Sequence, residues 1–185
     1  MRTGSSSGPA DATVAAIIKE GGTAVTSYDS VAEFEGAGRI VQTAIDNYGR
    51  LDVVCHLAGV LRDRMVFNMG EEEWDGVLGV HLYGAFNLVR HAVPHMIQQR
   101  YGRILLFSSI SALGNSGQAN YAAAKMGMVG LARCMAEELA PYGITVNAIF
   151  PAGETRMTAT IPETAKQIRE QLGITGGREH AGRSI

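Results

Sequence analysis

Three near-continuous apolar runs stand out along the chain. They are residues 51–59 (LDVVCHLAG), 101–109 (YGRILLFSS) and 143–151 (GITVNAIFP). Runs of this kind are typical of strands that are buried on both faces of a parallel sheet. Residues 23–29 (TAVTSYD) form a shorter stretch that is rich in β-branched residues, and it predicts a further strand ahead of the other three.

Helical patterns separate these predicted strands. In one of them, Ile40, Val41, Ala44 and Ile45 share one face of a helix. The periodicity predicts helices at residues 10–22, 33–48, 71–99 with a break near Gly84, 120–140 up to Pro141, and 162–172. Strands that alternate with helices in this way predict an α/β fold with a parallel sheet.

The carboxyl ends of the predicted strands are the expected place of a site, because parallel α/β sheets bind their ligands there. The residues at these ends are Asp29, Ala58, Gly59, Ser108, Ser109 and Pro151. Tyr121 and Lys125 follow the third of these ends. We therefore expect the topology to gather all of them at one edge of the sheet.

Composition and charge limit the class of protein. A chain of 185 residues with 46% apolar and 18% charged residues can form one domain with a sizeable core. The net charge of −2 argues against a nucleic-acid or membrane-surface partner, and no apolar run is long enough to span a bilayer. The start of the chain has no apolar segment typical of a secretory signal, so we expect a cytoplasmic protein.

We expect a single domain with a flexible lead at residues 1–9, a core at 10–151 and a tail at 152–185. Cys55 and Cys134 lie far apart in sequence and inside apolar runs, which predicts buried free thiols in a reducing compartment. His91 and His95 are four residues apart, but no third ligand stands at a suitable spacing, so we expect no metal site.

A tyrosine and a lysine lie four positions apart in residues 117–127 (GQANYAAAKMG), at the start of a predicted helix. Residues at this spacing share a helix face, and an ammonium lowers the pKa of a neighbouring phenol from about 10. With a serine to polarise the substrate oxygen, Tyr121 and Lys125 indicate proton transfer at an alcohol or carbonyl carbon. The hydride transfer that accompanies this proton transfer requires a nicotinamide cofactor. The alternative is a surface pair without function.

The context of this pair resembles a known family. The stretch SSISALGNSGQANYAAAKMG resembles the active-site segment of short-chain dehydrogenases/reductases. Four other stretches resemble further segments of the family and occur in the same order: YDSVAEF, LDVVCHLAG, WDGVLGVHLYGAFNLVRHAVPHM and YGITVNAIFPAGETRM. The resemblance covers residues 10–160. It implies a Rossmann-like doubly wound parallel sheet and hydride transfer between NAD(H) or NADP(H) and a secondary alcohol or ketone.

The resemblance also implies roles for single residues. Tyr121 is implied as the general acid/base, and Lys125 as the residue that lowers its pKa and binds the nicotinamide ribose. The partner serine is Ser109 when positions are counted along the strand and Ser108 when they are counted back from Tyr121. We favour Ser109, because a one-residue slip on a strand turns the side chain to the other face. Ser111 is a third candidate.

Further contacts to the cofactor are implied by the same resemblance. The implied cofactor-binding residues are Asp29 and Ser30 at the adenine, Ala58 and Gly59 beside the cofactor, Tyr121 and Lys125, and Pro151 and Thr155 at the carboxamide. Residues 71–99 and 120–140 are implied as the contact of a homo-oligomer. The tail is implied to carry part of a substrate lid.

Two departures concern the expected asparagines. His56 and Leu57 replace the Asn-Asn pair of the family, and His81 replaces the asparagine of the interface helix, whose backbone carbonyl holds a relay water in the family. A histidine at the His81 position resembles the hydroxyacyl-CoA dehydrogenase part of multifunctional β-oxidation enzymes. This subgroup implies an acyl-thioester substrate. An acyl-carrier-protein ketoreductase is an alternative within the same class.

The chain lacks the family's first strand with its Gly-x-x-x-Gly-x-Gly turn, which binds the cofactor pyrophosphate, and it lacks the second and last strands. We therefore expect an incomplete sheet and favour a piece of a longer gene product. The alternatives are direct pairing of residues 23–29 with 51–57, or a gap filled by another chain. A catalytically inactive remnant that keeps the dimerisation helices is the main alternative function, and the sequence does not distinguish NAD from NADP.

Overall fold

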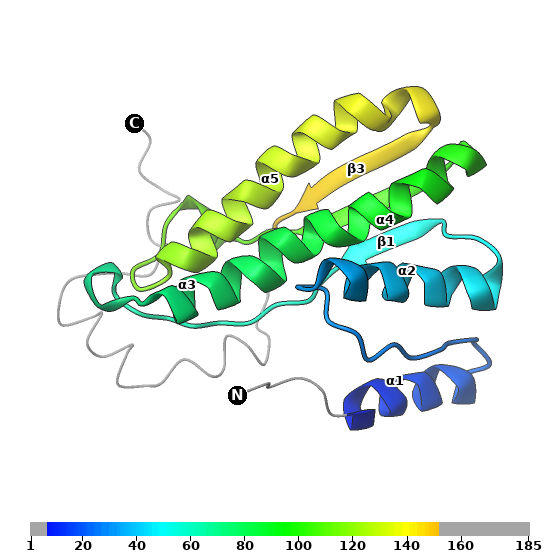
Figure 1. The fold of residues 1–185 in the computed structure, drawn as a ribbon, viewed down its shortest axis with the longest axis horizontal. Helices are drawn as coiled ribbons and strands as arrows, with labels where there is room; N and C mark the ends of the chain where they lie inside the picture. Colours follow the sequence, from blue (N-terminus) through cyan, green and yellow to red (C-terminus); the bar gives the residue numbers. More distant parts are fainter. Residues whose placement is uncertain (1–6, 152–185) are drawn as a thin grey trace.

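Three parallel strands form the centre of the protein, whose computed structural model describes residues 7–151 (Figure 1). They are β1 (Val53–His56), β2 (Gly102–Phe107) and β3 (Ile144–Ile149), in the spatial order β1-β2-β3. Val54 lies opposite Ile104 in the sheet, and Ile104 lies opposite Val146. The structure therefore confirms the α/β class and the three strands predicted from the apolar runs.

Helices connect the strands. Within residues 7–151 the α-helices are α1 (Ser7–Lys19), α2 (Phe34–Tyr48), α3 (Glu71–Leu78), α4 (Gly84–Gln99) and α5 (Ala119–Leu139). A π-helix, η2 (Gly79–Tyr83), joins α3 to α4, and short 3-10 helices lie at η1 (Val66–Asn68), η3 (Ile110–Leu113) and η4 (Ala140–Tyr142). In this part of the chain, no helix is both long and apolar enough to cross a bilayer. The helix predicted at 162–172 lies outside the described residues.

The helix break expected near Gly84 is a change of helix type and does not interrupt the helix. The chain stays helical from α3 to α4 and passes through the π-helix directly before Gly84. A Cβ atom at Gly84 would lie 2.9 Å from Cγ2 of Val31 and 3.2 Å from Cε1 of His56. The glycine is therefore required by a close approach to the loop before α2 and to the end of β1.

Helices α4 and α5 pack against one face of the sheet (Figure 1). Ile104 and Leu106 of β2 are fully buried there, together with Met96 of α4 and Met128 of α5. Burial of these apolar side chains is the main driving force for folding in this part of the molecule.

The opposite face of the sheet is less covered by the described residues. Val53 on β1 is 47% exposed, whereas Val54 is 8% exposed. The prediction of burial on both faces is wrong for β1, because α4 and α5 both lie on the Val54 side. The thiols of Cys55, on the open face, and Cys134, on α5, are free as expected, but both residues are exposed, so the prediction that they are buried is also wrong.

Residues 22–30 form a loop, so the strand predicted at 23–29 is wrong. A strand needs a neighbour for its backbone groups, and β1 pairs with β2 alone among the described strands. The suggested direct pairing of this segment with residues 51–57 is therefore also wrong. Side chains hold the loop instead: the hydroxyl of Tyr28 donates to Asp11, and Asp29 pairs with Arg39.

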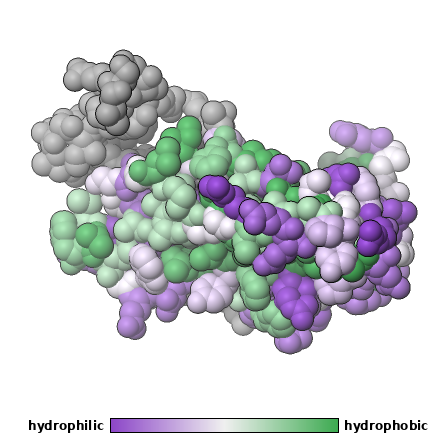
Figure 2. Space-filling model, turned by 90° about the horizontal axis from the view of Figure 1, so that it is seen from above, coloured by the Kyte–Doolittle hydropathy of each residue, from purple (hydrophilic) through white to green (hydrophobic). Residues whose placement is uncertain are grey.

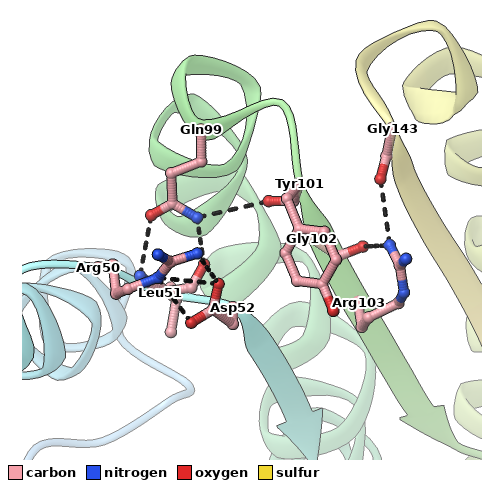
Figure 3. A network of polar contacts seen from close by, with 8 residues as sticks. All are labelled: Arg50, Leu51, Asp52, Gln99, Tyr101, Gly102, Arg103 and Gly143. Atoms are coloured by element: carbon pink, nitrogen blue, oxygen red, sulfur yellow. Dashed lines mark hydrogen bonds and ion pairs between the residues drawn. The ribbon is translucent and has the colours of Figure 1, made fainter.

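A polar network fixes the amino ends of the strands (Figure 3). The Gln99 side chain accepts a hydrogen bond from the amide of Leu51 at 3.0 Å and donates to the carbonyl of Leu51 at 2.9 Å. The guanidinium of Arg103 donates to the carbonyls of Gly102 and Gly143. These contacts join the end of α4 to the starts of all three strands and leave the carboxyl ends free to form a site.

Candidate active site

Tyr121 and Lys125 lie in the first two turns of α5, beside the carboxyl end of β2. Tyr121 is half-buried and Lys125 is 5% exposed. The Lys125 ammonium lies 5.5 Å from the centre of the Tyr121 ring and donates a hydrogen bond to the carbonyl of Phe107, the last residue of β2. The spacing on the helix therefore brings the two side chains together as expected.

The two serines after β2 point to different partners. Ser108 is buried, and its hydroxyl donates to the backbone carbonyl of Lys125 at 2.9 Å. The side chain of Ser109 is hydrogen-bonded to that of Tyr121, and its Oγ also accepts from the amide of Ser111 at 3.1 Å. Of the three candidates, Ser109 lies beside the phenol, Ser108 braces α5, and Ser111 supports Ser109 through its backbone.

The pKa of Tyr121 is raised above its usual value. Burial has the largest effect, since it disfavours the phenolate; the hydrogen bond from Ser109 lowers the pKa and the charge of Asp63 raises it. This direction is opposite to the one expected from Lys125. Burial also lowers the pKa of the Lys125 ammonium from 10.5 to about 8. The phenol is therefore protonated at neutral pH.

His81 lies under the phenol, in the π-helix. Its ring meets the ring of Tyr121 edge-on, with 5.0 Å between the centroids. Its Nε2 lies 2.9 Å from the carbonyl oxygen and 3.1 Å from the amide nitrogen of Val60, in the loop after β1. The π-helix thus turns a buried side chain toward the site, as such segments often do at functional positions.

His56 contacts the backbone of His81. Its Nε2 lies 3.0 Å from the His81 carbonyl, so this nitrogen carries the proton and donates. Burial, as the largest cause, lowers the pKa of both imidazoles, that of His81 to about 4. Both rings are therefore neutral at pH 7, and both Nδ1 atoms are buried without a partner among the described residues. His56 therefore occupies one lone pair of the His81 carbonyl, which the family resemblance implies as the group that holds a relay water.

The residues implied to contact the cofactor differ in their exposure and surroundings. Ala58 is exposed after β1, and Pro151 is exposed after β3. A Cβ atom at Gly59 would lie 2.5 Å from Cε1 of His81, so this glycine makes room for the histidine. Thr155 lies outside the described residues. Ala58, Gly59 and Pro151 therefore follow the strands at the same carboxyl edge of the sheet as the catalytic candidates, and Gly59 approaches His81.

Asp29 and Ser30 lie on the loop before α2 and have partners of their own. The Asp29 carboxylate is 2.7 Å from Nε of Arg39 and accepts from the hydroxyl of Ser27 at 3.2 Å. The hydroxyl of Ser30 accepts from the amide of Ala32 at 3.3 Å. The structure thus does not join Asp29 by any hydrogen bond to the group around Tyr121.

Two polar residues near Tyr121 were missed by sequence reasoning. Gln118 and Asn120 are buried, and their side chains bind the loop after β1 at Asp63 and Arg62. Their position directly before Tyr121, in a stretch otherwise made of alanine and glycine, is the feature that could have identified them. For residues 7–151, no cluster of three potential metal ligands is present.

A parallel α/β sheet with serine, tyrosine and lysine at its carboxyl edge defines the class of the protein. The family model for short chain dehydrogenases matches residues 2–166. The chain therefore belongs to the short-chain dehydrogenase/reductase family, as its motifs indicated, and its sheet is Rossmann-like.

Relatives agree with this assignment. The chain is 47% identical over 173 residues, 92% of its length, to a short-chain type dehydrogenase/reductase of Mycobacterium tuberculosis, and covers 60% of that protein. It is also 47% identical to the peroxisomal multifunctional enzyme type 2 of Mus musculus, with 85% of this chain and 21% of that one covered. The 3-oxoacyl-(acyl-carrier-protein) reductase of Thermotoga maritima is 41% identical over 87% of this chain and 65% of its own length.

A solved structure confirms the fold. A short chain dehydrogenase from Mycobacterium avium superposes with a TM-score of 0.77 at 42% sequence identity, covering 82% of this chain and 55% of that one. The chain thus spans a little over half the length of the relatives from the two mycobacteria.

Proposed function

We propose that this chain carries the proton-transfer group of a nicotinamide-dependent oxidoreductase that interconverts a secondary alcohol and a ketone. The observation that supports this function most strongly is the placement of both Ser109 and Lys125 close to the Tyr121 side chain. Family membership supports the same class of reaction.

The reaction follows from the side chains. The hydroxyls of Ser109 and Tyr121 would both donate to the substrate oxygen, and Tyr121 would transfer its proton to that oxygen as the carbonyl is reduced. The nicotinamide, when bound, supplies the hydride that the carbonyl carbon accepts. Because the pKa of Tyr121 is raised, its proton is present at neutral pH, which favours the acid role and hence reduction.

The residues at the Tyr121 end fit a nicotinamide ribose. The ammonium of Lys125 has three donors, and the carbonyl of Phe107 accepts one, which leaves two for ribose hydroxyls. The fit at the adenine end is poorer, because Arg39 holds one oxygen of Asp29. Asp29, Ser30, Ala58, Gly59 and Pro151, with Thr155, remain the proposed further contacts to NAD or NADP.

A 3-oxoacyl or 3-hydroxyacyl thioester is the proposed substrate class. Among the relatives are a 3-oxoacyl-(acyl-carrier-protein) reductase and a peroxisomal hydratase-dehydrogenase-epimerase of Saccharomyces cerevisiae, which is 47% identical over 90% of this chain. The cytoplasmic location stays a prediction, since several relatives are named as peroxisomal proteins.

A homo-oligomer formed through α4 and α5 is the proposed assembly. Hydrophobic residues are exposed among hydrophilic ones on the face seen in Figure 2. Between α4 and α5, mainly apolar side chains line a groove of about 420 Å³, together with Arg90 and Glu138. Sedimentation of the wild-type chain and of Phe86→Glu, a change at an exposed residue in this groove, tests the assembly. A dimer that is insensitive to the substitution contradicts it.

Fluorescence titration with NADH and NADPH, followed by an assay of nicotinamide absorbance with acetoacetyl thioesters and simple ketones, tests the proposed reaction. Saturable binding of one cofactor and its oxidation by a ketone are expected. A chain that is folded by circular dichroism but neither binds nor oxidises either cofactor would contradict this function and favour the inactive remnant with dimerisation helices.

A further inference from the structure

One buried side chain joins Tyr121 to two other segments. Asn120 is 0% exposed, and its Nδ2 donates to the carbonyl of Arg62 at 3.0 Å and to the carbonyl of Glu73 at 2.8 Å. Its Oδ1 accepts from the amide of Tyr121 at 2.7 Å. The loop after β1, helix α3 and the first turn of α5 therefore meet at a single amide whose donors are all used.

Asp63, the next residue of the loop after β1, is held by the buried side-chain amide of Gln118. The Nε2 of Gln118 donates to the carboxylate of Asp63 at 2.9 Å, and its Oε1 accepts from Nδ2 of Asn115 at 2.7 Å. The backbone amide of Arg64 donates to the carbonyl of Gly117 at 2.8 Å. Three consecutive loop residues, 62–64, are thus bonded to the segment directly before Tyr121.

The same loop is also held from the other side. His81 contacts both backbone groups of Val60, and the ring of His81 packs edge-on against the ring of Tyr121. The loop therefore touches the surroundings of the phenol both through the backbone of α5 and through an imidazole. Residues 60–64 are therefore linked to Tyr121 by two separate sets of contacts.

We propose that Asp63, Gln118 and Asn120 form a latch that fixes Tyr121 and the start of α5 to the loop after β1, so that the two segments move as one unit. The relevance of the latch to a reaction rests on the proposed role of Tyr121 as the acid/base. The three are positioning residues, because they act on Tyr121 and not on a substrate.

The latch also places a charge near the phenol. The titratable groups that face Tyr121 in the described structure are Asp63 from the loop, Lys125 from α5 and His81 from η2. The pKa of about 4 leaves His81 neutral at pH 7, and Asp63 is the acidic residue among the three. Its effect is to raise the pKa of Tyr121, which keeps the phenol protonated.

Native-state amide hydrogen exchange in the Asn120→Ala variant tests whether the latch holds the loop after β1 against the start of α5. The substitution removes three hydrogen bonds of about 1 kcal/mol each, so exchange at the amide of Arg64 is expected to rise by more than about tenfold. Amides of the buried strand β2 report on global stability in the same sample. Asn147→Ala, at an exposed position on β3, is the matched control and should leave the Arg64 amide protected.

Tyrosine titration of Asp63→Asn tests the electrostatic part. This variant keeps an acceptor for Gln118 and removes the charge. The ring-carbon NMR signal of Tyr121, assigned with Tyr121→Phe, should titrate at lower pH than in the wild type. Asp46→Asn, which removes a charge on exposed α2, should not move it. A merely structural change would not shift this titration in a defined direction.

Neither readout requires turnover or a cofactor, so the latch can fail while the proposed function stands, or the reverse. If Asn120→Ala does not fold, Gln118→Glu tests the same contacts, because it sets a like charge against Asp63. Unchanged exchange at Arg64 in both foldable variants, or an unchanged Tyr121 titration in Asp63→Asn, would overturn the proposal.

Discussion

The surroundings of Tyr121 and of Asp29 are built in different ways, although both are expected to serve one cofactor. Lys125, His81 and Asn120 are buried and bonded, respectively, to the end of β2, the loop after β1 and the first turn of α3. Asp29 lies on a loop and is held by an exposed arginine on α2. The contrast indicates that the geometry of the proposed proton-transfer group is fixed by tertiary packing, whereas the proposed adenine contact depends on surface interactions that are easily changed.

A large effect is expected at Lys125, which is proposed to contact both the phenol and the cofactor. Lys125→Ala should reduce turnover at least about a hundredfold, because its ammonium is both a proposed ribose ligand and the cation nearest the phenol. Cofactor affinity, measured by NADH fluorescence, should fall as well. A variant that loses turnover but keeps full affinity would remove Lys125 from the cofactor contacts.

The pH dependence of stability should show the burial of His81. Its pKa falls from 6.5 to about 4 on folding, so the unfolded chain binds more protons between these values. Stability should therefore decrease as the pH falls through this window, by about 3 kcal/mol for this group, with His56 acting in the same direction. Urea unfolding of wild type and His81→Gln across this range measures the effect, and equal pH slopes in the two would contradict it.

Substitutions at two glycines, Gly59 and Gly130, compare a tightly packed position beside His81 with an open one. Gly59→Ala should destabilise the chain by about 1–3 kcal/mol, because the new Cβ would lie 2.5 Å from Cε1 of His81. Gly130→Ala, in the middle of α5 with open space around its position, should stabilise it by up to about 1 kcal/mol. Thermal unfolding compares the two. A tolerated Gly59→Ala would mean that His81 is not confined.

The smallest effect is expected at the adenine end. Arg39→Gln removes an exposed ion pair, so the free energy of unfolding should change by less than about 1 kcal/mol. Because the substitution frees Asp29, cofactor binding should become about twofold tighter. Weaker binding in Arg39→Gln would show instead that the ion pair positions Asp29 for the cofactor.

Local patterns in the sequence predicted much of this arrangement. The apolar runs located β1, β2 and β3, and alternation along β2 favoured Ser109 over Ser108 beside Tyr121, which the contacts support. The same patterns failed where the outcome depends on neighbours. Among the described residues, no strand lies beside residues 23–29 despite their strand composition, and Val53 and Cys55 are apolar but exposed.

The remaining features of the site arise from contacts between distant segments. The bond from His56 to the carbonyl of His81 joins residues 25 positions apart, and the bond from Asn120 to Arg62 joins residues 58 apart. No periodicity encodes such pairs. The raised pKa of Tyr121 was also not predictable, because it depends on burial and on Asp63 rather than on the spacing to Lys125.

The most direct test of the account compares turnover and cofactor binding in Tyr121→Phe with those in Tyr48→Phe, a control at the exposed end of α2. The account predicts that Tyr121→Phe loses about a thousandfold in turnover and keeps its affinity for NADH or NADPH, while Tyr48→Phe matches the wild type in both. Equal loss of turnover and binding in Tyr121→Phe, or turnover that survives without the phenol, would contradict the role of Tyr121 as the acid/base.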